Sequence, residues 1–139
     1  MALKFEKTLS YQLMQLGAIA RQESLAPLRD KGLQIGDDAV LFWLADRSRV
    51  TLEEMREGLN LPPEQFNALI DRLDGTQMLE SQTDEIDGTI HLFLSVTGLE
   101  LLSQIHSRLK ALDKDFTAEL SDHKAKKLKK LLAKINDLF

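Results

Sequence analysis

The segment from Met78 to Ser95 constrains the fold of this chain most. Two runs of residues that favour strands, MLESQT and TIHLFLS, are joined by DEIDG, which ends in a glycine suited to a positive φ angle. This pattern predicts a two-stranded β-hairpin. Its turn carries Asp84, Glu85 and Asp87 and no basic residue.

Helical patterns precede the hairpin. Apolar residues recur at spacings of three and four from Phe5 to Leu28, which predicts one amphipathic helix over that range. A short, apolar second helix is expected in GDDAVLFWLADRS, where Asp37 or Asp38 can cap its start. The sequence TLEE, beginning at Thr51, is a capping box and predicts a third helix that stops near Gly58.

A fourth helix is predicted after Pro62 and Pro63, because proline is accepted in the first turn of a helix. Its buried stripe consists of Phe66, Leu69, Ile70 and Leu73. Beyond the hairpin, Ser95 can cap a long helix, and a last helix with a leucine stripe follows it. The expected fold class is therefore mainly α with a small β-hairpin.

The composition is that of an ordinary globular domain. The chain has 139 residues, of which 43% are hydrophobic and 29% charged, and its length predicts one domain. It has no cysteine, which excludes disulfides and thiol redox chemistry. No apolar run approaches the length of a membrane span and the first ten residues lack the apolar centre of a signal peptide, so we expect a cytoplasmic protein.

Charge is unevenly distributed along the chain. Residues 1–122 carry a net charge of −9, whereas residues 123–139 hold six lysines and one aspartate, a net charge of +5. The lysines of KAKKLKKLLAK are interpreted as a solvated face opposite the leucines, with contact to phosphate or a membrane surface as the alternative. We expect no membrane partner.

Three short helices followed by a β-hairpin are typical of a winged helix-turn-helix, in which the last short helix enters the major groove of DNA. The segments LAPLRDKGLQIGDDAVLFWLA, TLEEMREGLNLPPEQFNALIDRL and LSVTGLELLSQI occur here in that order. Over nearly its whole length the chain resembles the MarR family of bacterial transcriptional regulators. The resemblance implies a single domain at 1–139, with dimerisation helices at 1–35 and 97–139 and the winged module at 36–96.

The resemblance also implies a homodimer that binds double-stranded DNA and, in many members, responds to a small aromatic effector. Trp43 is the candidate for an effector cleft, while a place in the core beside Phe42, Met55 and Phe66 is the alternative. The apolar stripes of the first and last helices are too long to be covered by the winged module alone, which favours dimerisation. The candidate dimerisation residues are Leu9, Leu13, Leu16, Leu128, Leu131, Leu132 and Ile135.

Candidate DNA contacts come from the segment after the second helix and from the fourth helix, and they include unusually few basic residues. Family members usually have one or two arginines in the hairpin turn, where this chain has Asp87 and Gly88. On the fourth helix, Glu64 and Asp71 oppose approach to phosphate. The predicted contacts are Arg47, Arg49, Gln65, Asn67 and Arg72, with the two amides suited to adenine edges.

The charge of this region leaves two functions open. Residues 36–98 hold four arginines against thirteen acidic residues, a net charge of −9. One interpretation is a regulator whose DNA affinity rests on few phosphate contacts. The alternative is a winged-helix interaction module that has lost DNA binding and pairs with another protein.

No enzyme chemistry is predicted. His91, His106 and His123 fall on different elements without metal-ligand spacing, and the chain lacks a glycine-rich phosphate loop. Paired carboxylates such as Glu53 with Glu54 sit at helix starts, where the helix dipole accounts for them. We therefore expect no catalytic residue, no metal and no cofactor.

Overall fold

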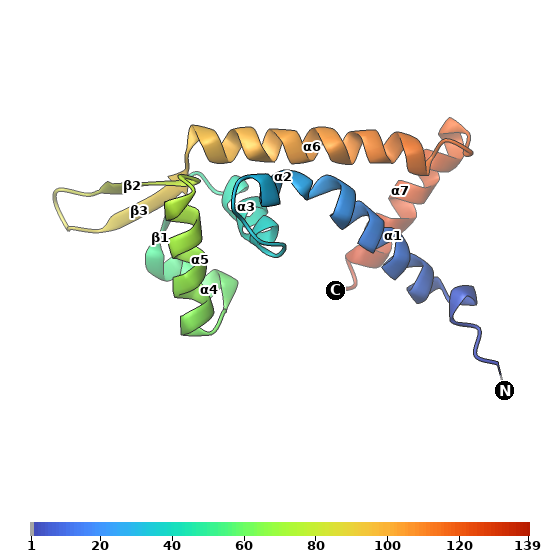
Figure 1. Ribbon diagram of the computed structural model, residues 1–139, viewed down its shortest axis with the longest axis horizontal. Helices are drawn as coiled ribbons and strands as arrows, with labels where there is room; N and C mark the ends of the chain where they lie inside the picture. The colour runs from blue at the N-terminus through green and yellow to red at the C-terminus, as the bar shows by residue number, and fades with distance from the viewer. Residues whose placement is uncertain (1) are drawn as a thin grey trace.

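A computed structural model describes residues 2–139 as seven α-helices with a three-stranded sheet (Figure 1). A 3₁₀ turn, Phe5–Lys7, precedes the first helix. The helices are α1 (Leu9–Ser24), α2 (Ala26–Asp30), α3 (Asp37–Ala45), α4 (Leu52–Leu59), α5 (Pro63–Gly75), α6 (Val96–Phe116) and α7 (Asp122–Asn136). The strands are β1 (Val50–Thr51), β2 (Leu79–Thr83) and β3 (Ile90–Leu94). The mainly helical fold class predicted from the sequence is confirmed.

The helix predicted over Phe5 to Leu28 is interrupted, so that prediction was wrong. Thr8 caps α1 by accepting a hydrogen bond from the backbone N–H of Tyr11, and α1 ends at Ser24. A separate helix then begins with Pro27 in its first turn. Proline lacks an N–H, and its ring clashes with the carbonyl four residues before it, so a continuous helix is disfavoured there.

The start of α3 also differs from the prediction. Gly36, with φ of 110°, is the N-cap, and both aspartates lie inside the first turn of the helix. The Asp37 carboxylate accepts a hydrogen bond from the N–H of Gln34 at 3.0 Å, and that of Asp38 accepts one from the N–H of Gly36 at 2.8 Å. The aspartates thus stabilise the loop before the helix, and the glycine supplies the positive φ at the cap.

The starts of α4 and α5 follow the sequence closely. Thr51 Oγ1 accepts a hydrogen bond from the N–H of Glu54 at 3.1 Å, the first half of the predicted capping box, and its hydroxyl donates to Glu54 Oε1. Asn60, in the left-handed conformation with φ of 49°, ends α4. The next helix has Pro62 as its N-cap and Pro63 at its first position, where a missing N–H costs nothing.

The hairpin is confirmed, with one strand added to it. β2 pairs antiparallel with β3 in the register Leu79 to Leu94 and Thr83 to Ile90. The two-residue strand β1 pairs with the other edge of β3, giving the order β1-β3-β2. The sequence did not predict β1, because two residues are too few to show an alternating pattern.

The core is formed by the winged module together with Leu25, Leu28, Leu33 and the first half of α6. Leu101 and Ile105 of α6 are buried among α2, α3 and the hairpin side of the module. Gly98 permits this approach, since a Cβ there would lie 2.7 Å from the carbonyl oxygen of Met78. From this buried first part, α6 extends away from the hairpin to the end of the molecule where α1 and α7 lie (Figure 1).

Candidate nucleic-acid interface

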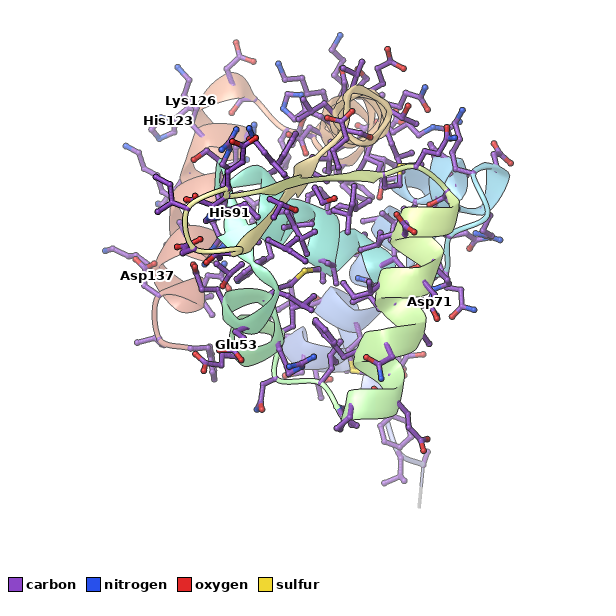
Figure 2. The ribbon with its side chains drawn as sticks, turned by 90° about the vertical axis from the view of Figure 1, so that its left-hand side faces the viewer. Glu53, Asp71, His91, His123, Lys126 and Asp137 are labelled. Atoms are coloured by element: carbon purple, nitrogen blue, oxygen red, sulfur yellow. The ribbon has the colours of Figure 1, made fainter. Side chains whose placement is uncertain are left out.

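The two faces of α5 differ sharply in polarity. Phe66, Leu69 and Leu73 are buried against the module, as the apolar stripe predicted. Gln65 and Asn67, the amides predicted to contact bases, are both exposed. Asp71 lies on the outer side of α5, away from the other elements (Figure 2). This helix therefore presents amides and carboxylates together to any ligand.

Arg72 is held inside the module. Its Nε and Nη2 donate hydrogen bonds to the two carboxylate oxygens of Asp37 at 3.0 and 2.8 Å. The Asp37 side chain is only 4% exposed and that of Arg72 27%. These hydrogen bonds raise the pKa of the Arg72 guanidinium above its ordinary value. The bidentate pair links the start of α3 to α5 and occupies two of the donors that a phosphate would use.

A second ion pair extends this link towards α1. Arg21 lies 3.4 Å from Asp38, whose side chain is 6% exposed. The adjacent buried aspartates at the start of α3 thus bind arginines from two different helices, α5 and α1. Sequence reasoning predicted that Asp37 or Asp38 caps the helix and missed these ion pairs, because the partners lie 17 and 35 residues away.

The other arginines of the module lie on aromatic rings. The Cζ atom of Arg47 is 3.9 Å from the centre of the Trp43 ring, and its Nη1 donates a hydrogen bond to the Trp43 carbonyl at 2.8 Å. Arg49 lies 5.4 Å from the ring centre of Phe93. Both side chains belong to exposed residues, so their remaining donors face solvent. Their role as DNA contacts stays a prediction.

Trp43 is half-buried and tightly enclosed. Its ring packs against the core, with Gly58 of α4 on one side and Arg47 stacked on it. A Cβ added at Gly58 would come within 2.5 Å of the ring. The structure thus favours the alternative of a core residue, and a ligand role for Trp43 stays a prediction.

Replacing Gly58 with alanine is expected to displace the Trp43 ring. The added methyl group overfills the contact, and overpacking of this kind costs about 1–3 kcal/mol of unfolding free energy. Urea denaturation followed by Trp43 emission measures the loss and the change in environment. The matched control is Gly75→Ala, whose Cβ meets nothing within 4 Å. Equal stability of the two variants would contradict the tight contact.

Comparison of the fold with solved structures identifies its type. No family model matches the sequence, and no curated protein matches it. The transcriptional regulator Tm0710 of Thermotoga maritima superposes with a TM-score of 0.71 at 18% identity, over 93% of this chain and 92% of that one. Wild-type apo MarR of E. coli gives a TM-score of 0.66 at 18% identity, over 92% and 96% of the two chains. The chain has the winged-helix fold of the MarR family. A MarR family protein of Mycobacterium tuberculosis, Rv2887, in complex with DNA, also matches with a TM-score of 0.66 at 21% identity, over 92% and 97%.

The wing of this MarR-type fold, the hairpin of β2 and β3, has an acidic tip whose aspartates stabilise the turn. The Asp84 carboxylate accepts a hydrogen bond from the N–H of Ile86, and the Asp87 carboxylate accepts one from that of Thr89, each at 2.8 Å. The bond from Thr89 lowers the pKa of Asp87 below its ordinary value, with a smaller contribution from His91. Aspartates commonly close turns in this way. The aspartates that close the turn of the hairpin therefore also give its tip a negative charge.

The helices outside the winged module leave long apolar stripes uncovered. No residue of α7 is buried, and Leu131 and Leu132 are 48% and 41% exposed. Figure 2 shows His123 and Lys126 pointing outward from the same helix. The other predicted dimerisation residues are all at least 40% exposed: Leu9, Leu13, Leu16, Leu128 and Ile135. Their role as dimerisation residues stays a prediction.

Residues 2–139 contain no group of three or more histidine, cysteine, aspartate or glutamate side chains placed to hold a metal ion. Within the same range, no helix combines the length and apolar character needed to cross a bilayer.

Proposed function

We propose that the protein is a homodimeric DNA-binding transcriptional regulator. The observation that carries this proposal is the MarR-type fold, with the exposed amides Gln65 and Asn67 on α5. Structures with the same fold include the M. tuberculosis protein in complex with DNA and a mutant E. coli MarR in complex with operator DNA. In a winged helix-turn-helix, the helix corresponding to α5 enters the major groove.

The side chains of the module divide into two roles under this proposal. Gln65 and Asn67 contact base edges, where amides pair well with adenine. Arg47 and Arg49 contact phosphate with the donors that face solvent. Arg72 acts differently, because its ion pair with Asp37 fixes the position of α5 relative to α3. Glu64 and Asp71 repel phosphate and lower affinity for DNA in general.

The homodimer proposal rests on the uncovered stripes. The leucines of α1 and α7 lie at the end of the molecule opposite the hairpin (Figure 1). Pairing two chains through these helices removes the apolar surface from water and leaves both winged modules free. Two modules related by a two-fold axis match a pseudo-palindromic DNA site.

A titration of duplex DNA at several salt concentrations tests DNA binding. Two arginines per chain give four phosphate contacts per dimer, so log affinity should fall with log salt with a slope no steeper than about −4. Changing Arg47 and Arg49 to alanine should flatten the slope and abolish most of the binding measured by fluorescence anisotropy. Arg29→Ala, an exposed position on α2, is the matched control. A slope unchanged by the double substitution would show that these arginines do not contact phosphate. Absence of binding at the lowest salt concentration would contradict the proposal that the protein binds DNA.

One observation favours the second candidate, an interaction module that no longer binds DNA. All four arginines of residues 36–98 lie against partners within the module: Arg72 on Asp37, and Arg47, Arg49 and Arg56 on aromatic rings. The thirteen acidic residues of this region leave it at −9, a charge that attracts a basic protein surface and repels DNA. The same titration separates the two candidates.

A further inference from the structure

A groove of about 230 Å³ lies between α5 and the hairpin. Its floor is apolar and is formed by Ile70 of α5, Leu79 of β2, and Ile90 and Leu92 of β3. Ile90 is 49% exposed, so the floor is open to solvent. This hairpin groove is large enough to receive an apolar side chain of a partner.

Two carboxylates stand at the rim of the hairpin groove. Asp74 and Glu80 line it, and both belong to exposed residues. Neither takes part in the ion pairs found within residues 2–139, which join Arg21 to Asp38, Arg72 to Asp37 and Lys129 to Asp113. Residues 36–98 contain no lysine, and their four arginines are held elsewhere in the module. The negative charge of the rim is therefore uncompensated.

Duplex DNA does not suit such a groove. The rim repels phosphate, and an aliphatic floor offers a phosphate or a sugar no hydrogen bond. A protein segment with an apolar side chain flanked by lysine or arginine matches both the floor and the rim. Charge complementarity thus selects a basic protein segment as the occupant.

We propose that the hairpin groove docks a basic amphipathic segment of a partner protein. One apolar side chain of the segment enters the groove, and its basic residues pair with Asp74 and Glu80. Because Asn67 lies one turn before Ile70 on the same face of α5, a docked segment also restricts access to Asn67. The surface therefore gives a partner protein a way to control the recognition helix, and it operates whether or not the protein binds DNA.

A synthetic amphipathic peptide of leucine and lysine serves as the probe for this groove. Its binding to the full chain is measured by fluorescence anisotropy, beside a peptide in which glutamate replaces every lysine. The wild-type protein should bind the lysine peptide and not the glutamate peptide. Changing Asp74 to asparagine together with Glu80 to glutamine should weaken binding about tenfold, since two exposed ion pairs are lost. Ile90→Thr keeps a strand-forming residue and should weaken binding by removing part of the floor.

The matched control removes two carboxylates outside the module. Glu100→Gln with Glu119→Gln removes the same two negative charges at exposed positions and should leave peptide affinity unchanged. Equal effects of the two pairs, or no binding of the lysine peptide, would overturn the proposal. If the Asp74 and Glu80 variant gains affinity for duplex DNA and keeps its affinity for the peptide, the occupant is DNA and the proposal is wrong. If the wild-type protein forms assemblies larger than a dimer and this variant does not, the occupant is α7 of another copy, which also contradicts the proposal. Failure of DNA binding itself is detected separately, by the salt titration of duplex DNA with the Arg47 and Arg49 variant.

Discussion

Replacing both Leu131 and Leu132 with lysine is expected to convert the protein from a dimer to a monomer. The two leucines lie in the exposed stripe of α7, at 48% and 41% exposure. Fully burying an exposed leucine contributes about 1.5–3 kcal/mol, and because these leucines are already about half buried, four of them per dimer contribute roughly 3–6 kcal/mol of association free energy. Each lysine also places an unpaired charge in the interface. Sedimentation velocity or light scattering should report the mass of one 15.8 kDa chain.

Two controls separate loss of the interface from loss of the fold. His123→Lys with Ala133→Lys adds two lysines on the opposite side of α7 and should leave the dimer intact. Because no residue of α7 is buried in a single chain, the winged module should stay folded in the leucine variant. Unchanged Trp43 emission would show this. A dimer that survives the leucine substitutions would mean that the stripe is not the interface.

The parts of this molecule predicted from its sequence are those that depend on local interactions. The N-cap at Thr51, the proline start of α5 and the hairpin each depend on residues close together in the chain, and each is present. Pro27 was visible in the sequence, but the apolar periodicity on both sides of it led to the prediction of one continuous helix. In the structure the helix is interrupted before Pro27.

The electrostatic connections of the candidate site could not be predicted in the same way. Arg72 was predicted to face phosphate because it flanks the outer face of α5, and only the folded arrangement of the chain brings Asp37, at the start of α3, within 2.8 Å of it. Pairing across 35 residues leaves no periodic pattern in the sequence. The net charge of −9 over residues 36–98 did indicate the acidic character of the surface, though not the groove that the hairpin forms with α5.

Substituting Asp37 with alanine should cost the protein about 2–4 kcal/mol of unfolding free energy. Removing one partner of a buried ion pair typically costs about 3–5 kcal/mol, and the partial exposure of Arg72 lowers the expected value. The N–H of Gln34 loses its acceptor in the same variant. Urea denaturation followed by circular dichroism measures the effect. Asp71→Ala removes the same charge from the outer side of α5 and should change stability by less than about 0.5 kcal/mol.

A double-mutant cycle distinguishes the ion pair from general damage to the loop. If Arg72 and Asp37 act as a unit, Arg72→Ala in the Asp37→Ala background should cost much less than it does in the wild type. Additive losses would show that Asp37 stabilises only the start of α3, through Gln34. Strong coupling would mean that the position of α5 depends on this pair. Gln65 and Asn67, which we propose to contact bases, and Ile70 in the floor of the hairpin groove would then all depend on the ion pair at Asp37.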